Sequence, residues 1–375
     1  AGSRRVWRSC GMALVLQTGA PAPGVTAPGL AAPVAGPQLG SLALADTPQE
    51  VKLTDSLVSR LAVGKVYRDH KASINGLDFT YDGQHLVTSG EDNNTYIYDC
   101  EKAQRTKNLR CEKYGVGLAR FLHNDKDSVL AASRSPTDHI LKYWDLHDNK
   151  YIRLFRSHDG AVNSISPHPY EDTFISGSED KTMMLWDLRQ DRPLAKIQGH
   201  GSTFATYDQQ GLVFAACVGH PKLHLFDSRN YAKGEFSSFD LSTHLKQDPA
   251  IRNVQFSPCG KYLLVRTRKQ LMLVDAFDGE PICEYPISKS IREGVEPDVA
   301  DAPTPVPGFS PDSQYVISGV PGGDICIWST TNARLVHRLQ GHTQTPGHVM
   351  FSPINALIIT AAETLAWWIP DSKAA

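Results

Sequence analysis

The chain has 375 residues, of which 41% are hydrophobic and 21% are charged, and its 38 basic and 40 acidic residues leave a net charge of −2. This composition is typical of a globular chain with a buried core, and it argues against a whole surface that binds nucleic acid by charge alone. No apolar run is long enough for a membrane-spanning helix. The seven cysteines include no C-x-x-C pair, so neither a disulfide framework nor a zinc site is expected.

The first 50 residues are rich in Ala, Gly and Pro and contain few aromatic or β-branched residues. Such a segment buries too little apolar surface to form a packed element. We therefore predict a disordered extension over 1–50, a folded domain over 51–371 and a short C-terminal tail over 372–375.

A repeating pattern begins in the folded domain. Residues 86–99 and 174–187 each show a β-branched or aromatic segment, a turn with Gly and acidic residues, and a second such segment that ends in aromatic–Asp. This ending, or a degraded form of it, recurs seven times at spacings of 40–54 residues: Tyr98-Asp99, Trp144-Asp145, Trp186-Asp187, Phe226-Asp227, Val274-Asp275, Trp328-Ser329 and Trp368-Ile369. The period and the Gly-His dipeptides at 199–200 and 341–342 are the signature of WD40 repeats, one four-stranded blade each. The sequence predicts an all-β, seven-bladed propeller.

The two ends of the domain are expected to share one blade. The last repeat has only three strand candidates, at 347–351, 356–361 and 365–369, and the apolar segment Leu61–Tyr67 precedes the first complete repeat. We expect this segment to be the fourth strand of the last blade, which closes the ring.

The sixth repeat is irregular. Residues 292–309 stand where its first strand should be, and Pro303, Pro305 and Pro307 have no amide proton to give to a central strand. We interpret them as a loop insertion that leads to a short strand near Phe309.

The third repeat contains His158, Ser176, Asp180 and Trp186, which WD40 propellers arrange as a hydrogen-bonded string. A His and an Asp in contact also occur in catalytic sites, but no nucleophile accompanies them here, so we expect a structural network. No metalloprotease, nucleophile-elbow, P-loop or dinucleotide motif is found. We therefore predict no catalytic residue, no metal and no cofactor.

Two further patterns are candidate interaction motifs. Arg266, Arg268 and Lys269 fall at a tight turn and could hold an acidic or phosphorylated peptide, although an ordinary solvated turn is the simpler interpretation. Trp186, Asp187 and Arg189 match W-D-x-R, a motif of some propellers that deliver substrates to cullin-type ubiquitin ligases, so a substrate receptor is the alternative function.

Several segments resemble the WD repeat-containing protein 82 family, and the similarity covers 52–370. The segments that carry it include Val51–Ser56, which resembles the start M-K-L-T-D-S, Leu146–Arg153, Asp172–Ser178, Gly211–Ala216 and Trp368–Pro370. The resemblance is weakest at 284–309.

The resemblance implies a nuclear, chromatin-associated, non-catalytic scaffold. Members of this family are propeller subunits of COMPASS-type complexes, in which they bind the SET-domain enzyme that methylates lysine 4 of histone H3. They link that enzyme to the phosphorylated tail of RNA polymerase II, and they also occur with a type-1 phosphatase and with mRNA 3′-end processing factors. No membrane partner and no sequence-specific contact with nucleic acid are expected.

Overall fold

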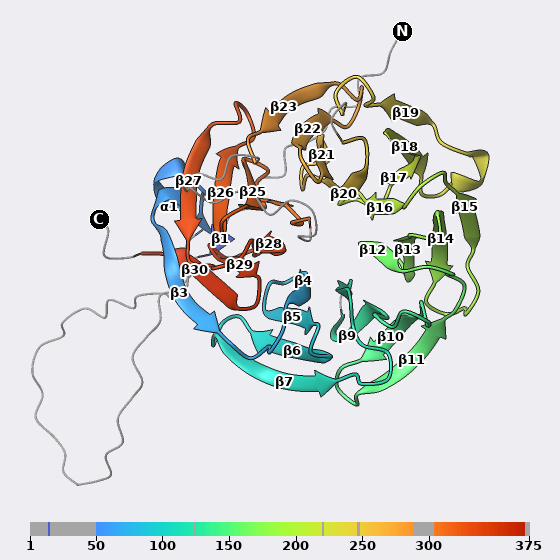
Figure 1. The fold of residues 1–375 in the computed structure, drawn as a ribbon, viewed down its shortest axis with the longest axis horizontal. Helices are drawn as coiled ribbons and strands as arrows, with labels where there is room; N and C mark the ends of the chain where they lie inside the picture. Colours follow the sequence, from blue (N-terminus) through green and yellow to red (C-terminus); the bar gives the residue numbers. More distant parts are fainter. Residues whose placement is uncertain are drawn as a thin grey trace, which may run out of the picture.

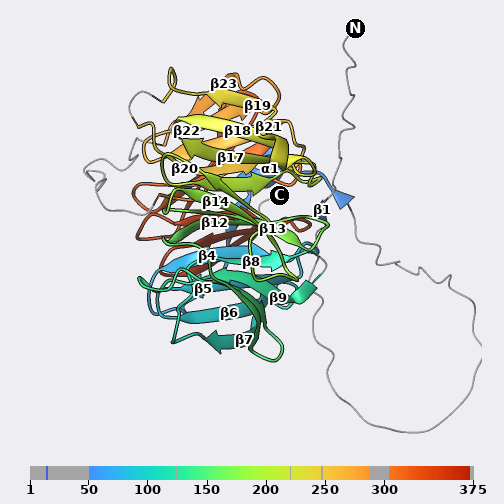
Figure 2. The ribbon, with the colours of Figure 1, turned by 90° about the vertical axis from the view of Figure 1, so that its right-hand side faces the viewer.

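The computed structural model describes residues 14–15, 50–123, 125–219, 221–245, 248–287 and 304–371. Seven four-stranded antiparallel sheets are arranged around a central axis, as Figure 1 shows. Viewed from the side in Figure 2, the ring is a thick disc. The predicted seven-bladed propeller is confirmed.

The blades are numbered here by the order of their first strands. Each runs outward from the axis, and its strands have these bounds: blade 1, β4(Ile74–Phe79), β5(His85–Gly90), β6(Asn94–Asp99) and β7(Gln104–Arg110); blade 2, β8(Ala119–Leu122), β9(Asp125–Ala132), β10(Leu141–Asp145) and β11(Lys150–Phe155); blade 3, β12(Val162–Pro167), β13(Thr173–Ser178), β14(Thr182–Asp187) and β15(Ala195–Gln198); blade 4, β16(Phe204–Tyr207), β17(Val213–Gly219), β18(Lys222–Asp227) and β19(Ser237–Asp240); blade 5, β20(Ile251–Phe256), β21(Tyr262–Thr267), β22(Leu271–Asp275) and β23(Pro281–Tyr285); blade 6, β24(Gly308–Phe309), β25(Tyr315–Val320), β26(Asp324–Ser329) and β27(Leu335–Gln340); blade 7, β28(His348–Phe351), β29(Ile358–Ala361), β30(Leu365–Pro370) and β3(Leu61–Tyr67).

The core lies between neighbouring blades. The second and third strands of each sheet are largely buried on both faces because each face packs against another blade. All seven aromatic–Asp endings or their variants lie in third strands. The indoles of Trp144, Trp186, Trp328 and Trp368 are among the largest fully buried side chains. These tryptophans therefore fill the seams between blades.

The ring closes as expected. β3 pairs antiparallel with β30, with Leu61 opposite Pro370 and Tyr67 opposite Leu365. The strand that precedes the first complete repeat is thus the outer strand of the last blade, next to β30 in Figure 1.

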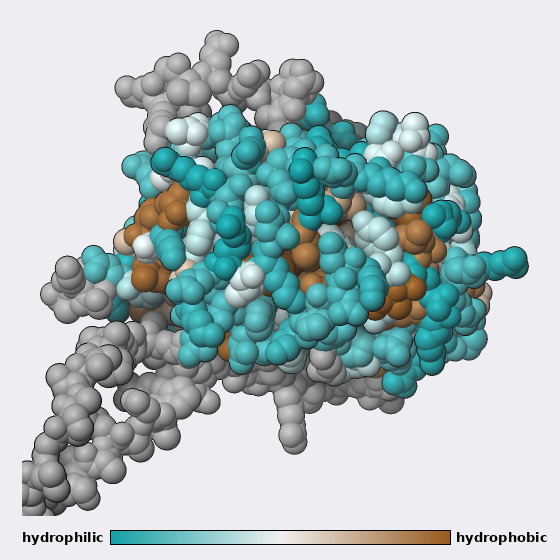
Figure 3. All heavy atoms as spheres, turned by 90° about the horizontal axis from the view of Figure 1, so that it is seen from below, coloured by the Kyte–Doolittle hydropathy of each residue, from teal (hydrophilic) through white to brown (hydrophobic). Residues whose placement is uncertain are grey.

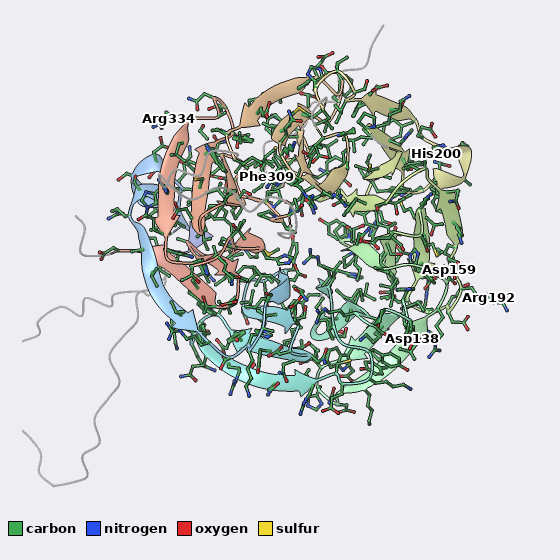
Figure 4. The ribbon with its side chains drawn as sticks, in the orientation of Figure 1. Asp138, Asp159, Arg192, His200, Phe309 and Arg334 are labelled. Carbon is green, nitrogen blue, oxygen red and sulfur yellow. The ribbon has the colours of Figure 1, made fainter. Side chains whose placement is uncertain are left out.

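A short helix before β3 was not anticipated. In α1(Asp55–Ser59) the Thr54 side chain caps the N-terminus by accepting the N–H of Leu57. Leu57 and Val58 are buried between blades 6 and 7. The Asp55 carboxylate accepts the Tyr315 hydroxyl at 2.7 Å and pairs with Arg334, which Figure 4 places on the outside of the ring. The helix therefore fastens the closing strand to blade 6.

Blade 6 begins with the short strand that the prolines predicted. Its inner strand β24 has two residues, and Figure 4 places Phe309 toward the axis. The insertion before it lies largely outside the described residues, as does the C-terminal tail. The same holds for most of 1–50, except that β1(Leu14–Val15) pairs with β2(Glu50–Val51), a contact that the expected disordered extension did not include. Among the described residues no helix is long and apolar enough to cross a membrane.

Candidate functional site

The structure joins the four polar side chains of blade 3 into one string. His158 Nδ1 lies 2.8 Å from Asp180 Oδ2, and His158 Nε2 lies 2.8 Å from Ser176 Oγ. The Trp186 indole N–H also donates to Ser176 Oγ at 2.8 Å. An ionised carboxylate can only accept, so Nδ1 carries the proton and Nε2 accepts from the serine hydroxyl.

The charges in this string are fixed by burial and hydrogen bonding. Burial lowers the pKa of His158, against the opposing effect of Asp180, so the imidazole is neutral. Burial would raise the pKa of Asp180, but hydrogen bonds from Thr182 and His158 outweigh it and hold the value at about 2. The Ser176 side chain is fully buried, and its hydroxyl already bonds both His158 and the indole N–H of Trp186. The arrangement favours a structural role over a catalytic one.

Two further strings were missed in the sequence. In blade 1, His70 contacts Asp92 at 3.0 Å and Thr88 at 2.9 Å, and in blade 7 His342 contacts Thr360 at 2.7 Å. The His and the hydroxyl residue are 18 positions apart in all three blades, and the His and the Asp are 22 apart in blades 1 and 3. That spacing is the signal that could have found both strings. The Gly-His dipeptide at 341–342 marks only the one in blade 7, since Asp69 precedes His70 in blade 1.

A central cavity of about 350 Å³ is lined by the inner strands. At one side Arg120 Nη1 donates to the Leu77 carbonyl at 2.6 Å and stays 4.0 Å from Asp78. Asp78 Oδ2 accepts the Phe121 N–H at 2.8 Å. Burial raises the pKa of Asp78 to about 6, against the lowering effect of Arg120. Sequence reasoning did not identify this cavity, because its lining comes from inner strands of several blades.

The predicted basic cluster is divided by the structure. Arg268 and Lys269 are exposed at the turn between β21 and β22, but Arg266 lies within β21 and is only 2% exposed. The expectation that all three project from one exposed turn therefore fails for Arg266. The reason is that the turn is shorter than the sequence suggested, since β21 extends to Thr267.

The W-D-x-R segment is also only partly accessible. Trp186 is fully buried, and Asp187 is 6% exposed. Arg189 donates to both carboxylate oxygens of Asp187, with Nε to Oδ1 at 2.9 Å and Nη2 to Oδ2 at 2.8 Å. The motif therefore forms a local ion pair whose only exposed member is Arg189.

Large exposed side chains mark one face of the ring. In an antiparallel meander the turns after the first and third strands lie at the same edge of the sheet. Tyr81, Tyr170 and Phe277 stand in such turns of blades 1, 3 and 5 and are 60%, 60% and 87% exposed. The rim seen in Figure 3 is mainly hydrophilic, with separate hydrophobic areas. The aromatic-bearing face is therefore a candidate contact surface.

Comparisons with known proteins agree with this architecture. The family model "WD domain, G-beta repeat" matches residues 62–99 and 149–187. The chain is 36% identical to WD repeat-containing protein 82 of Drosophila melanogaster, over 86% of this chain and 99% of that protein. The chain belongs to the WD repeat-containing protein 82 family.

Relatives from two yeasts extend the family. The chain is 29% identical to the protein named Set1 complex component swd2 of Schizosaccharomyces pombe, over 86% of this chain and 92% of that protein. It is 28% identical to the COMPASS component SWD2 of Saccharomyces cerevisiae, over 80% of this chain and 91% of that protein. The family resemblance expected from the sequence is thus confirmed. Among the described residues no group of three His, Cys, Asp or Glu side chains is placed to hold a metal ion.

Proposed function

We propose that this chain is a non-catalytic scaffold subunit of a COMPASS-type histone H3 lysine-4 methyltransferase complex in the nucleus. The observation that carries the proposal is the near full-length match to family members whose names place them in the Set1 complex or COMPASS. The architecture supports it, because a ring with two faces and a rim can bind several partners at once.

The two faces differ in the side chains they present. Tyr81, Tyr170 and Phe277 lie on the face with the first and third turns, and aromatic residues are enriched at protein interfaces. Arg268 and Lys269 lie on the opposite face, in a turn between second and third strands. This separation supports one face for the SET-domain subunit and another for a recruiting partner.

In the finer form of the proposal, the recruiting partner is the phosphorylated tail of RNA polymerase II. The exposed Arg268 and Lys269 can attract phosphate groups, although contacts at such exposed charges are individually weak. A type-1 phosphatase and mRNA 3′-end processing factors are further partners that the family resemblance supports.

The test is affinity purification of the tagged full chain from its own cells, followed by mass spectrometry. We expect SET-domain methyltransferase subunits, with reduced recovery when Tyr81 and Tyr170 are both changed to Ser and unchanged recovery in an Arg189→Ala control. A cullin adaptor that is lost with Arg189→Ala would instead identify a ligase substrate receptor. Absence of both partner sets from a folded chain would refute the scaffold.

A further inference from the structure

The chain that enters blade 6 is displaced from its own sheet. Before β24, the Val306 N–H donates to the Gly347 carbonyl at 2.8 Å, and Val306 forms a parallel bridge with His348 of β28. Of the described residues that precede β25, Gly308 and Phe309 alone pair with it. The segment that should continue the inner strand of blade 6 is therefore bonded to blade 7 at Val306.

Two side-chain acceptors on the inner strand of blade 5 have no donor among the described residues. In the seam between blades 3 and 4, Ser164 Oγ accepts the Ala205 N–H at 3.1 Å and Ser166 Oγ accepts the Tyr207 N–H at 3.0 Å. The registers place Asn253 and Gln255 at the positions of these serines. Asn253 Oδ1 and Gln255 Oε1 are buried without a hydrogen-bond partner in the described part of the chain.

The donor for Asn253 is missing because the corresponding residue of blade 6 is a proline. In blade 6 Phe309 pairs with Val316, and in blade 4 Tyr207 pairs with Phe214 at the equivalent position. Two residues earlier along each inner strand, Pro307 of blade 6 therefore corresponds to Ala205 of blade 4. Proline has no N–H to give. The seam between blades 5 and 6 therefore lacks the bond that joins the inner strands of blades 3 and 4 at this level.

The same seam contains a buried cation at a position where the other blades have small side chains. The registers align Arg266 with these six residues: Ser89, Ala132, Gly177, Cys217, Gly319 and Ala361. A Cβ on Gly177 would lie 2.4 Å from the Thr203 carbonyl oxygen of the next blade, which explains the small side chain there. Arg266 fits because the corresponding segment of blade 6 is displaced.

Arg266 forms no ion pair with any of the described residues. Its Nε and Nη1 are buried and make no hydrogen bond, although the side chain remains a cation because burial lowers its pKa only to about 10. Asp248 acts on it electrostatically, but Asp248 Oδ2 accepts the Arg268 N–H at 2.8 Å. A buried charge is normally retained only when an opposite charge or a set of acceptors is supplied.

From these observations we infer that the seam between blades 5 and 6 binds an extended, acidic segment of a partner protein. A carboxylate or phosphate group of that segment pairs with Arg266, and backbone N–H groups of the segment donate to Asn253 and Gln255. Asn253, Gln255 and Pro307 line the central cavity, and Arg266 lies behind this lining, opposite Asn253 in the ladder. The segment would therefore enter from the cavity and reach Arg266 beside Asn253. The inference concerns this chain alone and does not depend on the complex in which it works.

Peptide binding to the full chain tests the site. The probes are a short blocked peptide with one central Glu, its phosphoserine counterpart, the same peptide with Gln, and inorganic phosphate. We expect the Glu or the phosphoserine peptide to bind, the Gln peptide to bind at least about thirtyfold more weakly, and Arg266→Leu to cause a similar loss. Arg268→Gln, on the turn that follows β21, and Asn163→Ala, elsewhere in the cavity, are the matched controls.

Thermal denaturation without peptide gives an independent readout. Removing an unpaired buried charge should leave the melting temperature of Arg266→Leu equal to or above that of the wild type, and the anionic peptide should raise the melting temperature only of proteins with Arg266. If Arg266→Leu does not fold, Arg266→Lys and Asn253→Ala carry the test and should each weaken peptide binding. No binding of either anionic peptide by the folded wild type, binding of phosphate alone, or equal binding by all variants would overturn the inference.

Discussion

Leu61 lies directly opposite Pro370, so the first and last strands of the propeller belong to one sheet. Closure therefore depends on β3, and removing it would leave β30 with an unpaired edge and expose the tryptophans beside it. We predict that a chain starting at residue 52 melts like the full chain and that one starting at residue 71 melts much lower or does not fold. Circular dichroism melting curves of the two chains measure this.

A third chain, starting at residue 61, separates the strand from the helix. It keeps β3 but loses α1 and the buried side chains of Leu57 and Val58, each worth about 1.5–3 kcal/mol when fully buried. It should therefore melt between the other two. Equal melting of all three chains would contradict the closure argument.

Breaking the hydrogen-bonded string in blade 3 should lower the stability of the protein without a separate loss of partner binding. Asp180→Ala removes the acceptor of the His158 imidazole N–H and should lower the free energy of unfolding by about 1–3 kcal/mol. Glu179→Ala, an exposed neighbour, should change it by less than about 0.5 kcal/mol. Urea unfolding measures both. If Asp180→Ala kept full stability yet lost partner binding, Asp180 would instead be an interface residue.

Acid should destabilise the protein through its buried histidines. His342 contacts Thr360 at 2.7 Å and Thr364 at 3.4 Å with no carboxylate in the string, and burial lowers its pKa from 6.5 to about 4. Between pH 4 and pH 6.5, His342 is therefore protonated in the unfolded chain and neutral in the folded chain. The stability is therefore complete above pH 6.5 and falls as the pH drops toward 4, by up to about 3 kcal/mol for this group.

His348 behaves in the same way, since burial first and Arg120 second lower its pKa to about 4. Urea unfolding at a series of pH values between 4 and 6.5 gives the slope of the free energy of unfolding against pH. In His342→Gln this slope should be shallower than in the wild type by the equivalent of about one proton. Asp180 titrates in a lower window, because its pKa of about 2 means that its contribution is lost only as the pH falls from 3.8 through 2. An unchanged slope in His342→Gln would contradict the assignment.

The sequence was sufficient for the fold because repetition makes many weak signals agree. The aromatic–Asp endings located the third strands, and the missing fourth strand of the last repeat located β3. The candidate sites were harder, since they depend on which blades are neighbours. Arg266 looked like part of an exposed basic turn, and only the register showed that it stands where Gly177 stands in blade 3.

The central cavity illustrates the same limit. Asp78, Arg120 and Gln255 come from inner strands of three blades, and nothing in their sequence spacing indicates that they line one space. The prolines of the insertion did predict a short β24. They did not predict that Asn253 lacks a donor, because Asn253 belongs to the neighbouring blade. Seam contacts join residues of different repeats, so a pattern within one repeat cannot reveal them.

The last prediction concerns the phosphorylated polymerase tail. Arg268 and Lys269 are exposed, so each contact with a phosphate should contribute no more than about 1 kcal/mol and should be screened by salt. Changing both residues to Glu should weaken the binding of a phosphorylated tail peptide at low salt, and the difference from the wild type should shrink as salt is added. Arg266 is buried, so Arg266→Leu should give a loss that is far less sensitive to salt. Titrations of the wild type, the double variant and Arg266→Leu at two salt concentrations distinguish binding at the exposed pair from binding at the buried Arg266. Equal affinity of the wild type and the double variant at low salt would remove Arg268 and Lys269 from the recruiting surface.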